Sequence, residues 1–119
     1  MQYLMLIYQN ESQFAKISEQ DRTAMYQEFG KLRNDLGTKF VGGNQLQPTT
    51  TATLVRVREG QRVVTDGPFA ETKEQLGGYI LIDAKDLDEA ISIAARIPVV
   101  RTGSIEVRPV VVRAQATPA

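Results

Sequence analysis

The chain has 119 residues, a length that forms one domain with a real hydrophobic core. Its 14 Lys and Arg residues balance 14 Asp and Glu residues, so it lacks the basic excess of nucleic-acid-binding proteins. It contains no cysteine and no histidine, which excludes disulfides, thiolate catalysis and catalytic triads that use histidine. Acid–base chemistry must therefore use carboxylates, lysine, tyrosine or a bound cofactor. Because no binding motif for a metal or cofactor is present, we expect neither.

The apolar run at the start, Met1 to Tyr8, has no basic leader or cleavage site and is too short to cross a bilayer. It predicts a strand over Tyr3 to Tyr8 that is apolar, and hence buried, on both faces. The turn-prone residues Asn10 to Gln13 are expected to end this strand. We expect a cytoplasmic protein that binds neither membranes nor nucleic acid.

Two helices are predicted from capping residues and apolar spacing. Ser18 suits the N-cap of the first, with Asp21 at the N3 position, and Gly37 ends it. Asp86 suits the N-cap of the second, with Glu89 as its reciprocal partner. The apolar positions expected to face the core are Met25, Phe29, Leu32 and Leu36 in the first helix, and Leu87, Ala90, Ile91, Ala94, Ala95 and Ile97 in the second.

Several further segments have the β-branched and apolar composition of strands. The dipeptide Glu59-Gly60 predicts a tight hairpin turn between two of them. Residues 114–119 lack a pattern and are expected to form a disordered tail after a single domain over residues 1–113. The predicted strands after the first are Phe40–Leu46, Thr49–Arg58, Gln61–Thr65, Gly77–Asp83 and Ser104–Val112.

The order of these elements is β-α-β, a hairpin insertion and β-α-β, which predicts an α+β protein with a ferredoxin-like arrangement. Two helices can cover only one face of such a sheet. The strands at Tyr3–Tyr8 and Tyr79–Ile82 are nevertheless apolar on both faces. A second copy packed sheet against sheet would bury the other face, so we expect a homodimer.

The segment from Thr65 to Tyr79, which begins Thr-Asp-Gly-Pro-Phe, resembles the signature of the YCII-related proteins that carry the DGPF motif. The resemblance extends over nearly the whole chain, including Gly42-Gly43 and the closing residues Gly103 to Pro109. It implies a ferredoxin-like fold and a dimeric α/β barrel. A His–Asp pair is the proposed active site of the wider YCII group, and without a histidine that pair cannot be carried over; Asp66 stands as an acidic residue.

The turn at Asp66 is the best candidate for a functional site. Asp66 can act as a catalytic general base or bind a ligand, or it can simply begin a turn, since Asp before Gly is a strong turn signal. A pocket beside this turn, between the sheet and a partner subunit, would take a small-molecule ligand. The residues expected to bind that ligand are Gly67, Pro68, Phe69, Glu71, Thr72, Tyr79, Glu106 and Arg108.

The pair Gly77-Gly78 leaves two interpretations open. Without side chains it can let a ligand approach the backbone, or it can mark the start of a strand near a β-bulge.

Two functions remain open at this stage. The first is a small-molecule binding protein or enzyme with its pocket near the Asp66 loop. The alternative is a regulatory or interaction module linked to extracytoplasmic-function sigma-factor signalling, a context that the resemblance suggests because genes for DGPF proteins often lie beside those sigma factors.

Overall fold

A computed structural model describes residues 1–67 and 72–113. The predicted tail, residues 114–119, lies outside the described residues. Three short 3₁₀ helices accompany the main elements: η1 (Gly37–Lys39), η2 (Thr49–Thr51) and η3 (Pro98–Arg101). In chain order the helices and strands are β1 (Gln2–Gln9), α1 (Glu11–Lys16), α2 (Glu19–Leu36), β2 (Phe40–Gln45), β3 (Thr53–Arg58), β4 (Gln61–Asp66), β5 (Gln75–Asp83), α3 (Leu87–Ala94) and β6 (Ser104–Pro109).

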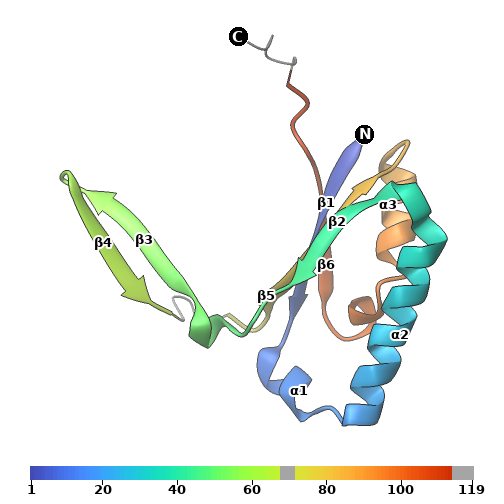
Figure 1. Ribbon diagram of the computed structural model, residues 1–119, viewed down its shortest axis with the longest axis horizontal. Helices are drawn as coiled ribbons and strands as arrows, with labels where there is room; N and C mark the ends of the chain where they lie inside the picture. Colours follow the sequence, from blue (N-terminus) through green and yellow to red (C-terminus); the bar gives the residue numbers. More distant parts are fainter. Residues whose placement is uncertain (68–71, 114–119) are drawn as a thin grey trace.

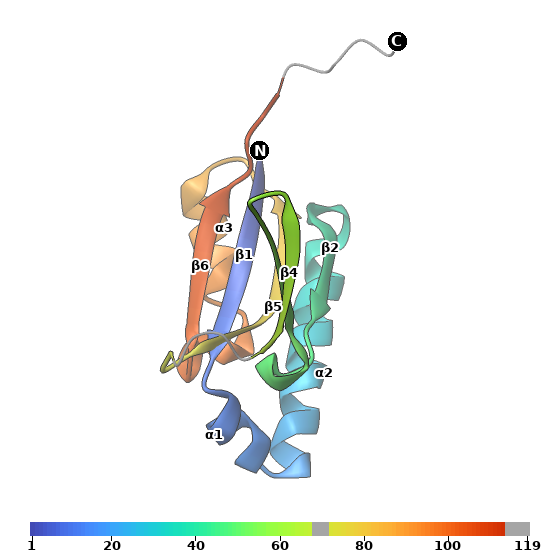
Figure 2. The same cartoon turned by 90° about the vertical axis from the view of Figure 1, so that its left-hand side faces the viewer.

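Four strands form one antiparallel sheet in the order β2-β5-β1-β6. Helices α2 and α3 pack on one face of this sheet, which we call the inner face (Figures 1 and 2). The prediction of an α+β fold is therefore confirmed. None of the described helices covers the opposite, outer face, and none is both long and apolar enough to span a membrane.

The hydrophobic core lies between the helices and the inner face. Side chains alternate between the two faces along a strand, and this alternation turns Tyr3 and Met5 of β1 and Ile80 and Ile82 of β5 inward, where they are buried. Their outward-facing neighbours on β1, Leu4 and Leu6, are only half-buried. Within one chain, β1 is thus buried on one side and partly covered on the other. The inward-facing strand residues pack with Leu32, Ala84, Ala90, Ile93, Ala94 and Ile97.

The polar segment after β1 was expected to be a turn, but it begins helix α1. The Asn10 side chain accepts a hydrogen bond from the Gln13 N–H at 3.0 Å and so acts as the N-cap. The helix has six residues and buries none of them. It therefore lacks the apolar periodicity by which the longer helices are recognised.

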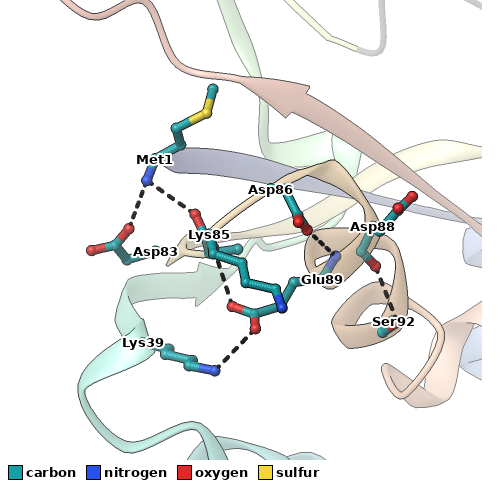
Figure 3. A network of polar contacts seen from close by, with 9 residues as sticks. Met1, Lys39, Asp83, Lys85, Asp86, Asp88, Glu89 and Ser92 are labelled. Atoms are coloured by element: carbon teal, nitrogen blue, oxygen red, sulfur yellow. Dashed lines mark hydrogen bonds and ion pairs between the residues drawn. The ribbon is translucent and has the colours of Figure 1, made fainter.

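The predicted caps of α2 and α3 are present. The Ser18 hydroxyl accepts from the Asp21 N–H at 3.0 Å, and Asp86 accepts from the Glu89 N–H at 2.9 Å. The Glu89 carboxylate accepts in return from the N–H of Lys85, one residue before the cap, and pairs with Lys39 Nζ at 3.3 Å (Figure 3). This second contact ties the start of α3 to η1, at the end of α2.

The apolar stripe predicted for α3 is partly wrong. Leu87 and Ile91 are about half exposed and Ala95 is exposed, whereas Ile93 is buried. Ala90, Ile93 and Ala94 of the core are spaced at i, i+3 and i+4 and form one face of α3, and Ile97 joins the core after the helix ends. The predicted apolar positions covered more than one side of the helix, and only some of them are part of the buried core.

Strands β3 and β4 form a separate two-stranded sheet, which we call the hairpin arm. Glu59 and Gly60 have φ angles of 53° and 75°, as the predicted tight turn requires. The arm projects from the body on the outer-face side of the sheet (Figures 1 and 2). Residues Thr49–Thr51, predicted as strand, instead form η2, in which the Thr51 N–H bonds the Pro48 carbonyl at 2.9 Å.

The last strand ends earlier than predicted, at Pro109 instead of Val112. The N–H of Val110 still donates to the carbonyl of Gln2 at 3.0 Å. Since β1 begins at Gln2, Val111 to Arg113 lie past the end of this strand.

Candidate functional site

A pocket of about 170 Å³ lies between the inner face of the sheet and helices α1 and α2. Most of its wall is apolar, and the polar groups that can face it come from two glutamine side chains and one tyrosine. The lining residues are Ile7, Gln9, Phe14, Met25, Tyr26, Phe29, Asn44, Gln45, Gly77, Gly78, Ile97, Pro98 and Val99.

Gly77 and Gly78 form part of the pocket lining. The register of β1 and β5 shifts so that Gly77 is an extra residue between the partners of Ile7 and Tyr8, which confirms the bulge. A Cβ atom on Gly77 would lie 2.8 Å from Nε2 of Gln9, and one on Gly78 would lie 3.0 Å from the backbone oxygen of Asn44. Side chains at these positions would crowd the pocket, so the glycines keep it open.

Helix α1, which was not predicted from the sequence, forms one wall of the pocket. Its Phe14 lines the pocket and is held by Arg22 of α2, whose guanidinium lies 5.0 Å from the centre of the Phe14 ring. Arg22 also donates from Nη2 to the Phe14 carbonyl at 3.0 Å. Met25 and Phe29, predicted to face the core, line the pocket from α2. The sequence did contain a signal for this helix, because Asn10 is a favourable N-cap residue. A helix that begins there includes Phe14.

Three of the predicted site residues, Tyr79, Glu106 and Arg108, lie on the outer face, on the other side of the sheet from the pocket. In the strand register Leu6 stands between Tyr79 and Glu106. Glu106 accepts from the Tyr8 hydroxyl at 3.2 Å and from Arg108 Nε at 2.8 Å. These contacts neutralise the carboxylate and hold it in place.

Tyr79 also lies on the outer face, beside Leu6, and its hydroxyl accepts a hydrogen bond from Asn44 Nδ2 at 3.0 Å. Asn44 is directly opposed to Tyr79, so its amide points to the outer face, although the residue also contributes to the pocket lining.

Asp66 is the last residue of β4 and is exposed, so the expected turn begins after it. It stands opposite Thr53, and the next residue, Gly67, donates its N–H to the Ala52 carbonyl at 2.7 Å. Asp66 is on the two-stranded sheet and Glu106 is on the four-stranded sheet, so strand pairing does not bring these two carboxylates together. The Thr72 hydroxyl donates to the carbonyl of Glu74 at 2.6 Å. The predicted ligand residues Pro68, Phe69 and Glu71 lie outside the described residues.

A second hollow, of about 370 Å³, lies at the end of the sheet where β1 begins and β5 ends. Four of its charged groups form two ion pairs: Lys39 with Glu89, and the terminal amine of Met1 with Asp83 at 3.1 Å (Figure 3). Across the described part of the chain, no cluster of three or more acidic side chains is placed to hold a metal ion.

Comparison with known proteins identifies the family. The family model of the YCII-related domain matches residues 1–113. The chain is 38% identical to "Uncharacterized protein R00369" of Rhizobium meliloti (strain 1021), with 92% of this chain and 91% of that protein covered. It also resembles the structure of 5-chloro-2-hydroxyhydroquinone dehydrochlorinase (TftG) from Burkholderia phenoliruptrix AC1100 in complex with 2,5-dihydroxybenzoquinone, at a TM-score of 0.55, 14% identity and 92% coverage of both chains. The chain belongs to the family of proteins with a YCII-related domain.

Proposed function

We propose that this chain binds a small, flat, largely apolar molecule, such as an oxygenated aromatic ring, in the pocket between the sheet, α1 and α2. The observation that carries this proposal is the pocket itself, with its apolar wall and its few amide and hydroxyl groups. An apolar cavity of about 150 Å³ is large enough for a benzene ring. The pocket here, at about 170 Å³, has a similar size.

The polar side chains of the pocket suit a ligand with oxygen substituents. The amides of Gln9 and Gln45 can each donate and accept hydrogen bonds, and the Tyr26 hydroxyl can do the same. The Tyr26 hydroxyl already accepts from Gln45 Nε2 at 3.3 Å, a long bond that a ligand oxygen can replace. The solved complex of TftG with 2,5-dihydroxybenzoquinone supports this ligand class.

Binding is favoured over acid–base catalysis in this pocket. Tyr26 is the one ionisable residue among the lining residues that the structure describes. A proton transfer at neutral pH needs a group whose pKa lies near 7, and carboxylates, lysine or histidine usually supply it. Asp66 stays a candidate for such a role, since it is exposed at the end of β4.

The proposal includes the assembly. The strand order and the two β-α-β units support a ferredoxin-like fold, and the segment from Thr65 supports membership of the DGPF subgroup. We propose that two copies pack outer face against outer face as a dimeric α/β barrel. Leu4, Leu6 and Leu81, half-buried on the face without helices, would be covered by this contact. We also propose that the protein is located in the cytoplasm, as expected from the sequence.

Calorimetric titration with 2,5-dihydroxybenzoquinone tests the site. Met25→Trp fills the pocket from α2, and we expect it to weaken binding at least tenfold. The matched control, Glu106→Gln, removes a charge from the outer face and should leave the affinity within twofold. The reverse pattern would move the ligand to the outer face, and a wild-type protein that does not bind the quinone would contradict the proposed ligand class.

A further inference from the structure

The hairpin arm carries an exposed apolar face. Directly opposed residues of two antiparallel strands point to the same side, and Val55 is opposed to Val64 while Val57 is opposed to Arg62. The side chains of Val55, Val57 and Val64 therefore share one face, with exposed fractions of 58%, 63% and 57%. A two-stranded hairpin without a covering layer is only marginally stable in water. Burial of this valine face against another surface would stabilise the hairpin arm.

The direction of the arm is set at its base and not by packing of its strands. Glu11 accepts from the Thr49 N–H and from the Thr49 hydroxyl, both at 2.8 Å, on the chain that enters the arm. Asn10 Nδ2 donates to the Lys73 carbonyl at 3.1 Å, on the chain that leaves it. The N–H of Glu11 also donates to Oε1 of Gln75 at 3.0 Å. The first residues of α1 thus hold both connections and keep the arm pointing away from its own sheet.

The surface of the chain is larger than a compact monomer needs. It exposes 8851 Å², whereas a compact protein of 13.2 kDa exposes about 6,400 Å². The radius of gyration is 17.0 Å, against about 13.5 Å for a compact domain of this length. The hairpin arm, which projects from the body, is one source of this extra area (Figure 1).

The charges on the valine face are arranged for self-recognition. Asp66, opposed to Thr53, lies at one end of this face, and Arg62, opposed to Val57, lies toward the other. When two identical faces of this kind pack antiparallel around a two-fold axis, each acidic end meets a basic end. The formal net charge of zero means that long-range repulsion does not oppose the pairing.

We propose that the hairpin arm packs on the equivalent arm of a second copy of this chain, valine face against valine face, with Asp66 paired to the partner's Arg62. This inference rests on the proposed homodimer and adds a second contact to it. The arm lies on the outer-face side of the sheet (Figures 1 and 2). A partner that packs on the outer face would therefore be on the same side of the molecule as the arm. The arm contact extends that interface and gives Asp66 an intersubunit role.

Sedimentation equilibrium and light scattering on the full chain test this contact. Val64→Asp should raise the dimer dissociation constant at least 100-fold, while Thr65→Asp, the next residue on the opposite face of the arm, should leave it within threefold. Asp66→Arg and Arg62→Asp should each raise it about tenfold, and the double charge swap should restore it. Circular dichroism should confirm that every variant keeps the fold.

Several results would overturn the proposal. A Val64→Asp variant that dimerises like the wild type would remove the arm contact. A double charge swap that fails to restore dimerisation would exclude arm-on-arm pairing and favour docking on another surface, of the partner or of a different protein. If Leu6→Asp dissociates the dimer and Val64→Asp does not, the outer-face dimer stands and the arm proposal fails. A wild-type mass of 13.2 kDa at micromolar concentration would end both.

Discussion

Glu28 of α2 and Arg101 of η3 form a bidentate ion pair, with Nη1–Oε1 and Nη2–Oε2 distances of 2.9 and 2.8 Å. The pair connects two walls of the pocket, because η3 begins with the lining residue Pro98 and α2 carries Met25. The hydrogen bonds and positive charge of Arg101 hold the pKa of Glu28 below its ordinary value of 4.5. In return, Glu28 raises the pKa of Arg101.

This pair predicts a small pH dependence of stability. A carboxylate with a lowered pKa in the folded state stabilises the fold above its unfolded pKa, near 4.5, and loses that contribution as pH falls through the lowered value. We expect Glu28→Gln to melt slightly below the wild type at pH 7 and equally at pH 2, since both partners are exposed and screened. Thermal unfolding between pH 2 and 7 measures this. A difference that does not change with pH would contradict it, with Glu19→Gln as the control.

The hydrogen bonds from Thr49 to Glu11 predict how the arm is held. Removing a charged acceptor of two hydrogen bonds costs about 1.5–3 kcal/mol when the donors stay unpaired. Because Glu11 is half-buried and Thr49 can bond water, we expect Glu11→Ala to lower the free energy of unfolding by about 1 kcal/mol. Hydrogen exchange in Thr53–Asp66 should also become faster. Gln13→Ala, on the same helix, is the control and should change neither quantity.

Two glycines should respond in opposite directions to substitution by alanine. A Cβ on Gly103 would lie closer than 3.0 Å to the backbone oxygen of Tyr8, whereas a Cβ on Gly30 would meet no atom within 4 Å. Gly103→Ala should destabilise the protein by about 1–3 kcal/mol, as overpacking does. Gly30→Ala, inside α2, should stabilise it by about 0.5–1 kcal/mol. Urea denaturation measures both, and changes of the same sign would contradict the packing described here.

The role of Asp66 can be separated from its place in the turn. Its carboxylate is exposed at the end of β4, so Asp66→Asn should leave the melting temperature within about 2 °C. Because Asp66 is not among the residues that line the pocket, quinone binding should also be unchanged, and its loss at unchanged stability would instead give Asp66 a role in the ligand site. A large fall in melting temperature with unchanged binding would instead assign Asp66 a structural role.

Several elements could be predicted from the sequence because they depend on local signals. Ser18 and Gly37 bound α2, Asp86 begins α3, and Glu59-Gly60 makes the hairpin turn, because a cap or a tight turn is decided by a few adjacent residues. The bulge at Gly77 follows from the same kind of signal. Helix α1 escaped detection because it buries no residue and so has no apolar pattern.

Which residues share a site depends on how distant elements pack together in the fold. Tyr79, Glu106 and Arg108 lie on the outer face, while the pocket on the inner face combines α1, α2, η3 and three strands. The residues of this pocket are far apart in the chain, and an apolar pattern looks the same whether its side chains fill a core or line a cavity. That distinction depends on how closely neighbouring elements approach. Here the side-chain-free Gly77 and Gly78 and the wall formed by Phe14 leave the space open.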